Sequence, residues 1–328
     1  MKKVLITGGT GFIGSHLAEY LINKKFKVTV FDRYNPNYNL GNLQNSQHKD
    51  KIKFIFGDIR DYDSTNRAIK DNDIIIHLAA LIGIPYSYFS PLAYVKTNIE
   101  GTYNVLESVK SNKKKKVIIT STSEVYGTAE YTPIDEKHPL NPQSPYSASK
   151  IAADNLALSY YYSFKTPVTL IRPFNTFGPR QSERAIIPSI INQILRSKDN
   201  SISLGNLYPR REFNFVEDVC EGYYKALNKN NFGETINIGN GYDISIKELV
   251  KLISQIMDRK IKIKQISNRK RLINSEIDLL KSDFSKAKNI LNWKPSHPGR
   301  TGLIRALKKT IEWYRNNTSK DIDKTYII

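Results

Sequence analysis

Short apolar runs rich in β-branched residues alternate with longer amphipathic stretches through the first half of the 328-residue chain. A run that stays apolar at every position is typical of a strand buried on both faces of a parallel sheet. Repeats of strand, helix and strand therefore predict an α/β fold with a Rossmann-type doubly wound parallel sheet. The predicted strands are residues 2–8, 27–32, 52–58, 73–80, 116–123 and 167–173, and the predicted helices include 14–24, 91–110 and 145–164.

After residue 178 the pattern changes, which indicates a second, smaller lobe. Amphipathic segments and short strands follow, but "ETINIGN" (234–240) has the composition of another strand of the large sheet. We therefore expect two lobes that interleave in the sequence. The predicted large domain comprises residues 1–178 and 213–240, the smaller lobe 179–212 and 241–316, and a tail 317–328.

The composition is that of a globular chain with an unusually basic surface. No apolar run reaches the roughly 18 residues that a membrane helix needs, so we expect no contact with a membrane. The single cysteine, Cys220, cannot form an internal disulfide, and together with the glycine-broken N-terminus it predicts a cytoplasmic protein. The formal net charge of +19 would attract nucleic acids and small phosphates alike, but no basic helix or aromatic RNA-binding signature accompanies it. Nucleic acid is therefore not an expected partner.

A glycine-rich turn, "TGGTGFIG", follows the first predicted strand and opens the first predicted helix. Gly8, Gly11 and Gly14 let the backbone turn tightly and approach a pyrophosphate, which the helix N-terminus then faces. Asp32 ends the second predicted strand, where a carboxylate accepts hydrogen bonds from ribose hydroxyls and repels a 2′-phosphate. The pattern predicts a dinucleotide site that prefers NAD, while the neighbouring Arg33 leaves NADP as an alternative.

Asp58 closes the third predicted strand, and two histidines lie close to the same region. We expect Asp58 to reach the adenine amino group, with a turn-stabilising aspartate as the alternative. His16 and His77 are expected to be structural, because no second ligand lies at the spacing that a metal site requires. No metal is therefore predicted.

A second group of polar side chains follows the fifth predicted strand and opens a later helix. "TSTSEVYG" (120–127) contains Thr122 and Glu124, and "SPYSASK" places Tyr146 and Lys150 four residues apart, on one helical face. A lysine ammonium near a phenol lowers its pKa, so that the tyrosinate can take a proton from a sugar hydroxyl as hydride leaves the same carbon. Thr122 can hydrogen-bond that hydroxyl.

Taken in their order along the chain, these motifs resemble the extended short-chain dehydrogenase/reductases that act on nucleotide sugars. The matching segments are "TGGTGFIG", "HLAA" with "TNIEGTYNVLE", "TSTSEVYG", "YSASK", "RPFNTFGPR", "REFNFVEDV" and "INIGNG". The resemblance implies NAD in the large domain and a nucleotide-diphosphate sugar against the smaller lobe. It assigns the following residues to the cofactor: Gly8, Gly11, Phe12, Ile13, Gly14, Asp32, Arg33, Asp58, Ile59, Leu78, Ala79, Ala80, Asn98, Tyr146 and Lys150.

Three segments look most like the 4,6-dehydratases of N-acetylglucosamine nucleotides in legionaminic-acid-type pathways: "LIGIPYSYFSPLAYVKTNIEGTYNVLES", "TSTSEVYGTA" and "PRQSERAIIPSIINQI". In such an enzyme Thr122, Tyr146 and Lys150 would serve oxidation at C4. Glu124 would then remove the C5 proton and protonate the departing C6 hydroxyl, and hydride would return to C6. Ser123 occupies the position of an acidic aspartate in thymidine-linked glucose dehydratases, as a serine does in GDP-mannose dehydratases, so Glu124 would carry both proton transfers.

Other interpretations of the same motifs stay open. "TSEVYG" also occurs in UDP-glucuronate decarboxylases, and a 4-epimerase needs only the hydroxyl residue, the tyrosine, the lysine and NAD. A non-catalytic NAD-binding regulator is a third interpretation, against which the intact Thr122, Tyr146 and Lys150 argue. For dehydration, the expected product is the 4-keto-6-deoxy sugar of a UDP- or GDP-linked N-acetylglucosamine or related hexose.

The resemblance also assigns substrate-binding residues. Ser87 matches a pocket serine near the hexose, and Asn175, Arg211 and Arg271 match positions that grip the nucleotide sugar, where arginines suit phosphate oxygens. Leu272 stands where relatives usually have proline, which leaves the backbone path at Arg271 uncertain.

Relatives of this kind commonly pair through a four-helix bundle that includes the helix bearing the catalytic tyrosine. The opposite side of that predicted helix carries Ala148, Ala152, Asn155 and Ser159, which are small enough for close helix contact. We therefore expect a homodimer.

Overall fold

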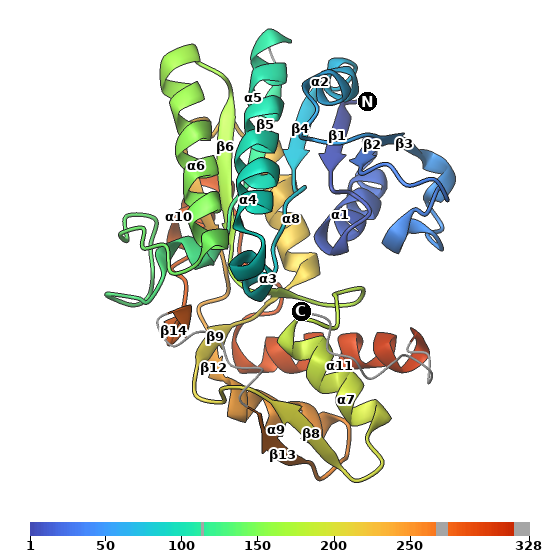
Figure 1. Cartoon of the computed structure of the whole chain (residues 1–328), viewed down its shortest axis with the longest axis vertical. Helices are drawn as coiled ribbons and strands as arrows, with labels where there is room; N and C mark the ends of the chain where they lie inside the picture. The colour runs from blue at the N-terminus through green and yellow to red at the C-terminus, as the bar shows by residue number, and fades with distance from the viewer. Residues whose placement is uncertain (113–114, 267–274, 318–328) are drawn as a thin grey trace.

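A parallel sheet forms the centre of the computed structural model, which describes residues 1–112, 115–266 and 275–317 (Figure 1). Within these residues the sheet has seven strands in the order β11-β6-β5-β4-β1-β2-β3, and its strands pair in parallel. The predicted fold class is therefore confirmed. The strands are β1 (Lys3–Thr7), β2 (Lys27–Asp32), β3 (Ile52–Phe56), β4 (Ile74–His77), β5 (Lys116–Thr120), β6 (Val168–Pro173) and β11 (Thr235–Ile238).

Alternate residues of each central strand enter two different hydrophobic cores, which explains the uninterrupted apolar runs. In β1, Val4 and Ile6 pack with α1 (Phe12–Asn23) and α8 (Val216–Leu227). Leu5 points to the other face, into the core formed with α2 (Tyr62–Lys70), α5 (Gly101–Ser111) and α6 (Pro145–Phe164). Figure 1 shows α5 and α6 standing side by side over this face. Because the strands are parallel, their carboxyl ends share one edge of the sheet.

The segment predicted as one helix over 91–110 is irregular. Helices α3 (Ile84–Phe89) and α4 (Pro91–Tyr94) lead into a π-helical turn, Val95–Glu100, which continues directly into α5. A π-helical turn adds one residue to the hydrogen-bonded ring and rotates the side chains that follow, and such turns are frequent at functional sites.

The smaller lobe lies beyond the carboxyl edge of the large sheet (Figure 1). Its small sheets have the orders β12-β9-β14 and β13-β8, and a further pair, β10-β7, is formed by residues of the predicted large domain. Helix α10 packs against β11 and α8 at the margin of the large sheet. The remaining elements are β7 (Thr176–Phe177), α7 (Ile186–Arg196), β8 (Ser201–Leu204), β9 (Arg210–Glu212), β10 (Asn214–Phe215), β12 (Asp243–Ser245), α9 (Ile246–Ile256), β13 (Lys262–Gln265), β14 (Leu279–Leu280), α10 (Ser285–Leu291) and α11 (Gly299–Asn317), with 3-10 turns at Gly41–Leu43, Lys49–Lys51 and Ser123–Tyr126.

One hydrophobic core runs from the large sheet into the lobe, so the two parts pack against each other. It joins Ile6 and Ile118 of the sheet to Ile190 of α7 and Leu249 of α9. Cys220 is buried in this core as a free cysteine. None of the helices in the described part of the chain is both long and apolar enough to cross a lipid bilayer.

Candidate active site

A cavity of about 980 Å³ lies between the carboxyl edge of the large sheet and the smaller lobe. Residues from the ends of β1, β2, β4 and β5 line one part of it, and residues around β7, α7 and β9 line the other. A cavity at this edge of a doubly wound sheet is where such folds bind nucleotides. Residues of both parts therefore face the same cavity.

The turn between β1 and α1 and the start of α1 have no room for a side chain at Gly8 or Gly14. Gly8 has a φ of +70°, and a Cβ there would lie 2.9 Å from the backbone of Ala79. A Cβ on Gly14 would lie 2.4 Å from the carbonyl oxygen of Gly8. Gly11 is the N-cap of α1 and supplies no capping side chain, so the first amides of this 12-residue helix remain available to an anion. This cradle fits the pyrophosphate of a dinucleotide.

Asp32 lies at the end of β2, beside the glycine turn. Its Oδ2 accepts hydrogen bonds from the Thr10 amide at 2.9 Å and the Thr10 hydroxyl at 2.5 Å, and its Oδ1 accepts one from the Arg33 amide at 2.8 Å. Each carboxylate oxygen can accept more than one hydrogen bond, so these contacts orient the group and leave capacity for ribose hydroxyls. Arg33 also lines the cavity.

Asp58 lines the cavity but is engaged by a neighbour that the sequence analysis did not consider. Arg60 donates from Nε to both of its carboxylate oxygens and from Nη2 to Oδ2 at 2.5 Å. The hydrogen bond with Arg60 lowers the pKa of Asp58, which stays ionised. An adenine amino group would therefore share this carboxylate with Arg60. The other predicted cofactor residues that line the cavity are Phe12, Ile13, Ile59, Leu78, Ala79 and Ala80.

Asn98 is the predicted cofactor residue that does not line the cavity. It lies buried in the π-helical turn, where its Nδ2 donates to the Leu81 carbonyl at 3.0 Å and to Ser149 Oγ at 2.9 Å. Its Oδ1 accepts a hydrogen bond from the Leu81 amide at 2.9 Å. The side chain thus joins the chain after β4 to α6 and supports the cavity from behind.

Helix α6 presents Tyr146 and Lys150 at the carboxyl edge because of how it begins. Ser144 and Ser147 form a capping box, and Pro145 occupies the first helical turn. Tyr146 therefore lies in that first turn, with Lys150 one turn further on the same face, and both line the cavity. Lys150 donates from Nζ to the Thr120 carbonyl at 2.6 Å, which ties the helix to the end of β5.

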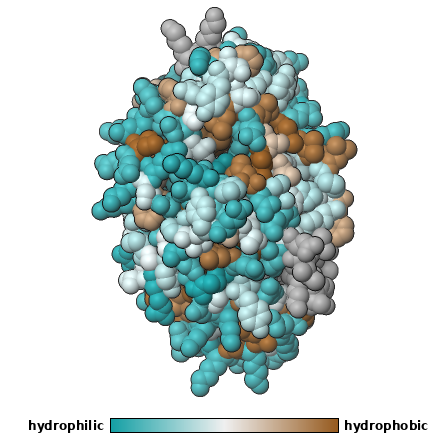
Figure 2. Space-filling model, turned by 90° about the vertical axis from the view of Figure 1, so that its left-hand side faces the viewer, coloured by the Kyte–Doolittle hydropathy of each residue, from teal (hydrophilic) through white to brown (hydrophobic). Residues whose placement is uncertain are grey.

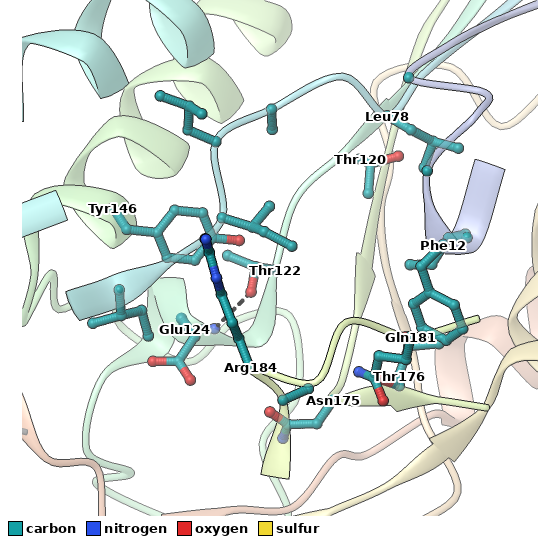
Figure 3. A pocket seen from close by; sticks show the side chains of 18 of the residues that line it. Phe12, Leu78, Thr120, Thr122, Glu124, Tyr146, Asn175, Thr176, Gln181 and Arg184 are labelled. Atoms are coloured by element: carbon teal, nitrogen blue, oxygen red, sulfur yellow. Dashed lines mark hydrogen bonds between the residues drawn. The ribbon is translucent and has the colours of Figure 1, made fainter. Parts of the chain in front are cut away.

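Thr122, Ser123 and Glu124 reach the same end of the cavity from the chain after β5. Thr122 caps the 3-10 turn by accepting a hydrogen bond from the Glu124 amide at 3.2 Å. Figure 3 shows Tyr146, Thr122 and Glu124 together on one side of the cavity, with the Tyr146 hydroxyl directed towards Thr122, and Phe12 and Leu78 on the other side. Two hydroxyls, a carboxylate and an ammonium therefore surround one region of the cavity.

The pKa of Tyr146 differs from the prediction. The nearby Lys150 predicts a lowered pKa for Tyr146, but in the folded chain the pKa of Tyr146 is raised, and burial is the largest cause. The hydrogen bond with Thr122 lowers the pKa, and the nearby Glu124 carboxylate raises it. Burial also lowers the pKa of Lys150, and the negative charge of Asp154 opposes this shift in part. The prediction was wrong because it considered the lysine charge without the cost of burying a phenolate.

Two of the four predicted substrate residues line the cavity. Asn175 and Arg211 line the cavity on the lobe side, and Arg211 forms an ion pair with Glu276 at 3.3 Å. Ser87 does not line the cavity, because it is fully buried in α3 and its hydroxyl donates to the Ile84 carbonyl at 2.7 Å. Arg271 lies outside the described residues.

Arg184 is a cavity residue that the sequence analysis did not single out. It lies between β7 and α7, and its side chain extends across Tyr146 and Thr122 in Figure 3. Burial raises the pKa of Tyr94 to about 12, and the charge of Arg184 partly opposes this shift; the Tyr94 ring packs edge-on against Tyr146. Arg184 therefore places a cation at the reactive end of the cavity. Its position in "PRQSERAIIP" indicates a loop before a helix, but only the packing of the lobe directs that loop inward.

The two histidines of the sequence analysis have protein partners. His77 is buried between Thr7 and Thr102 and bonds to both hydroxyls, and burial lowers its pKa to about 3. His16 bonds through Nε2 to the Pro179 carbonyl. In the part of the chain that the structure describes, no group of three or more His, Cys, Asp or Glu side chains could hold a metal ion.

Comparison with known proteins gives concordant results. The model of the family described as GDP-mannose 4,6 dehydratase matches residues 5–305. The dTDP-D-glucose 4,6-dehydratase of Dictyostelium discoideum is 34% identical, over 97% of this chain and 82% of that protein. The UDP-N-acetyl-alpha-D-glucosaminuronate decarboxylase of Bacillus cytotoxicus is 32% identical, over 96% of this chain and 98% of that protein.

A solved structure adds the cofactor. DesIV, a dTDP-glucose 4,6-dehydratase from Streptomyces venezuelae with NAD and TYD bound, superposes with a TM-score of 0.87 at 28% identity, over 96% of this chain and 97% of that chain. The NAD bound to DesIV agrees with the cofactor predicted from the glycine turn and Asp32.

Proposed function

Because the chain belongs to the GDP-mannose 4,6 dehydratase family, we propose that it is an NAD-dependent nucleotide-sugar 4,6-dehydratase. The observation that carries the proposal is the placement of Glu124 in the same end of the cavity as Thr122, Tyr146 and Lys150. The last three suffice for reversible oxidation of a sugar hydroxyl, whereas a dehydration needs a further group that can both accept and donate a proton.

The large domain, residues 1–178 and 213–240, would hold NAD. Gly8, Gly11 and Gly14 form a cradle for its pyrophosphate, and Asp32 would accept hydrogen bonds from the adenosine ribose. When bound, NAD supplies the chemistry of accepting hydride from C4 of the hexose and returning it at C6.

Tyr146 would act as the base for the C4 hydroxyl. To act as a base Tyr146 must first lose its own proton, and burial, which raises its pKa, makes this loss less favourable. Thr122 can hydrogen-bond both Tyr146 and the substrate hydroxyl, and the Lys150 ammonium lies one turn away on α6. Removal of the hydroxyl proton together with hydride leaves a C4 ketone, which makes the C5 proton acidic.

Glu124 would then remove the C5 proton and deliver a proton to the departing C6 hydroxyl, so that water leaves. Ser123 also lines the cavity and carries no acid group, which leaves Glu124 as the carboxylate of the segment Thr122–Glu124. To complete the reaction, C6 would regain the hydride and C5 would regain a proton, which balances the proton taken from the C4 hydroxyl. The sum is one molecule of water lost and a 4-keto-6-deoxy sugar formed, with the cofactor returned to its starting state.

The smaller lobe, residues 179–212 and 241–316, would hold the nucleotide-diphosphate sugar. Arg211 is the candidate partner of the diphosphate, where it would exchange its ion pair with Glu276 for phosphate oxygens. Asn175 and Arg184 line the same cavity as Glu124 and Tyr146, so they are candidate partners of the hexose (Figure 3). We propose a UDP- or GDP-linked N-acetylglucosamine as substrate, on the similarity of three segments to dehydratases of such nucleotides.

A second candidate function is decarboxylation of a nucleotide-linked uronic acid. The guanidinium of Arg184 in the cavity favours it, because a guanidinium can bind a carboxylate through two parallel hydrogen bonds. The relationship to the Bacillus cytotoxicus decarboxylase supports the same alternative.

The test offers UDP-GlcNAc, GDP-GlcNAc and UDP-glucuronic acid to the protein in heavy water and determines the mass of each product. Dehydration predicts loss of water and gain of one deuterium at C5, whereas decarboxylation predicts loss of carbon dioxide from the uronic acid. In the Glu124→Gln variant we expect C4 oxidation to persist and water loss to fall by at least about 100-fold, since general acid–base catalysis contributes roughly 10²–10⁴-fold.

Glu130→Gln is the matched control, because Glu130 carries the same group six residues later but is exposed and outside the cavity. This control is expected to retain wild-type turnover. Normal water loss by Glu124→Gln would show that the proposed mechanism is wrong.

A further inference from the structure

The residues proposed for oxidation and for elimination lie on different elements. Tyr146 and Lys150 belong to α6, whereas Glu124 belongs to the 3-10 turn that follows β5. The two proton transfers must act on neighbouring carbons of one hexose, and a displacement of about 1 Å can cost roughly 100-fold in rate. The relative position of these two elements is therefore decisive.

A buried carboxylate on α6 joins the start of the Glu124 segment to the helix. Asp154 lies one turn after Lys150 and is 1% exposed. Its Oδ2 accepts hydrogen bonds from Ser121 Oγ at 2.6 Å and from Arg172 Nε and Nη2 at 3.1 and 3.0 Å. Ser121 directly precedes Thr122, so the first of these bonds fixes where the segment leaves β5.

The same ion pair holds the other end of the segment. Arg172 donates from Nη1 to the Tyr126 hydroxyl at 3.1 Å, and its guanidinium lies 5.1 Å from the centre of the Tyr126 ring. The Tyr126 hydroxyl donates in turn to Asn237 Oδ1 on β11 at 2.7 Å. Tyr126 ends the 3-10 turn that carries Glu124 and is completely buried.

We infer that Ser121, Tyr126, Asp154 and Arg172 form a strand-end clamp that positions Glu124 relative to Tyr146 and so links elimination to C4 oxidation. The inference rests on the proposed function. Tyr126, Asp154 and Arg172 do not line the cavity, so they act as positioning residues rather than on the substrate.

Stability alone does not account for this network. A buried ion pair contributes little net stability compared with well-packed apolar residues, because two charges lose their hydration. The clamp instead fixes the orientation of residues 121–126, because its hydrogen bonds hold one end of this segment to the Asp154 carboxylate and the other end to the Arg172 guanidinium. The geometry of the Glu124 turn then depends on α6 and β6, which do not contain Glu124.

The experiment compares the two half-reactions in single turnover. Tyr126→Phe keeps the buried ring but removes the hydroxyl that Arg172 and Asn237 share. C4 oxidation, followed by the absorbance of the reduced nicotinamide, is expected to stay within about twofold of wild type. Deuterium entry at C5 and water loss are expected to slow by roughly ten- to 100-fold. Ser121→Ala, which frees the other end of the segment, should give the same imbalance.

Tyr223→Phe is the matched control. Tyr223 is an equally buried tyrosine whose hydroxyl bonds to Thr120 Oγ1 at 2.7 Å, at the same strand end but outside the clamp. Its ratio of elimination to oxidation is expected to match wild type. The inference is overturned if Tyr126→Phe and Ser121→Ala slow both steps equally or neither step. A wild-type protein that oxidises C4 without losing water would instead overturn the proposed function, and the clamp with it.

Discussion

At the scale of single residues, the reactive end of the cavity combines groups whose properties depend on burial. Tyr146 and Lys150 are both buried, and burial disfavours the charged form of each. The hydrogen bond with Thr122 opposes this effect at Tyr146. A tyrosine that must lose its proton to act as a base is therefore expected to make the reaction depend on pH.

The first prediction concerns this pH dependence. Because the neutral phenol of Tyr146 dominates at neutral pH and the phenolate is the reactive form, the rate of C4 oxidation should rise as the pH becomes alkaline. Thr122→Ala removes the bond that lowers the pKa of Tyr146, so the rise should shift to higher pH and the neutral-pH rate should fall about tenfold. Thr122→Ser retains a hydroxyl and is expected to restore the wild-type profile. Identical profiles for Thr122→Ala and wild type, in stopped-flow measurements across pH, would refute the role of Thr122.

At the scale of elements, the π-helical turn Val95–Glu100 brings Asn98 under the cavity floor. Asn98 satisfies both the amide and the carbonyl of Leu81 and reaches Ser149 of α6. Three segments that are distant in sequence are thus joined by one amide side chain. Asn98 does not line the cavity, but through these bonds it is expected to hold the cavity residue Leu81 in place against α6.

The second prediction concerns that amide. Asn98→Ala leaves the Leu81 amide and carbonyl without their partner, so unfolding by urea should show a loss of about 2–4 kcal/mol. Asn112→Ala is the control, because Asn112 also donates two hydrogen bonds, to Asn66 and Ser108, but is partly exposed and water can replace them. Its loss should stay below about 1 kcal/mol. Equal losses for the two variants would show that Asn98 has no special structural role.

At the scale of the whole molecule, α6 leaves one side uncovered. The predicted contact residues include Ala148, Asn155 and Ser159, which are exposed, and Ala152, which is half-buried. Large apolar side chains are exposed on the neighbouring segment, Leu92 at 63% and Val95 at 46%. Figure 2 shows apolar patches on the half of the molecule that contains the large sheet. An exposed apolar surface of this kind favours a partner.

The third prediction concerns a homodimer through the face of α6 that carries Ala152. In sedimentation velocity we expect a dimer for the wild-type protein and a monomer for Ala152→Arg, since a long cation would separate closely packed helices. Gln255→Arg adds the same charge to the exposed side of α9 in the lobe and should leave the dimer intact. A wild-type monomer at micromolar concentration, or a dimer that survives Ala152→Arg, would exclude this interface.

Local chemistry made several parts of the fold and the cavity predictable from the chain. Val4, Leu5 and Ile6 predict a strand buried on both faces, because a run that is apolar at every position leaves no polar face for solvent. The structure confirms it: all three side chains are buried. The spacing of Tyr146 and Lys150 predicts one helical face, and the capped start of α6 adds the position at the sheet edge. The glycine turn was predictable because the positive φ of Gly8 and the close approach of Gly14 to the Gly8 carbonyl are local requirements, although the contact of Gly8 with Ala79 is a long-range one.

The features that could not be predicted depend on contacts between segments that are distant in the sequence. The packing of the lobe directs Arg184 inward, the fold of α3 removes Ser87 from the cavity, and Arg60 occupies the carboxylate of Asp58. Burial reverses the expected pKa shift of Tyr146. The strands of the sheet, the nucleotide turn and the identity of the reactive groups could be read from the chain, since mostly short-range geometry governs them. Their charge states and neighbours depend on desolvation and long-range packing, which arise only when the chain is folded.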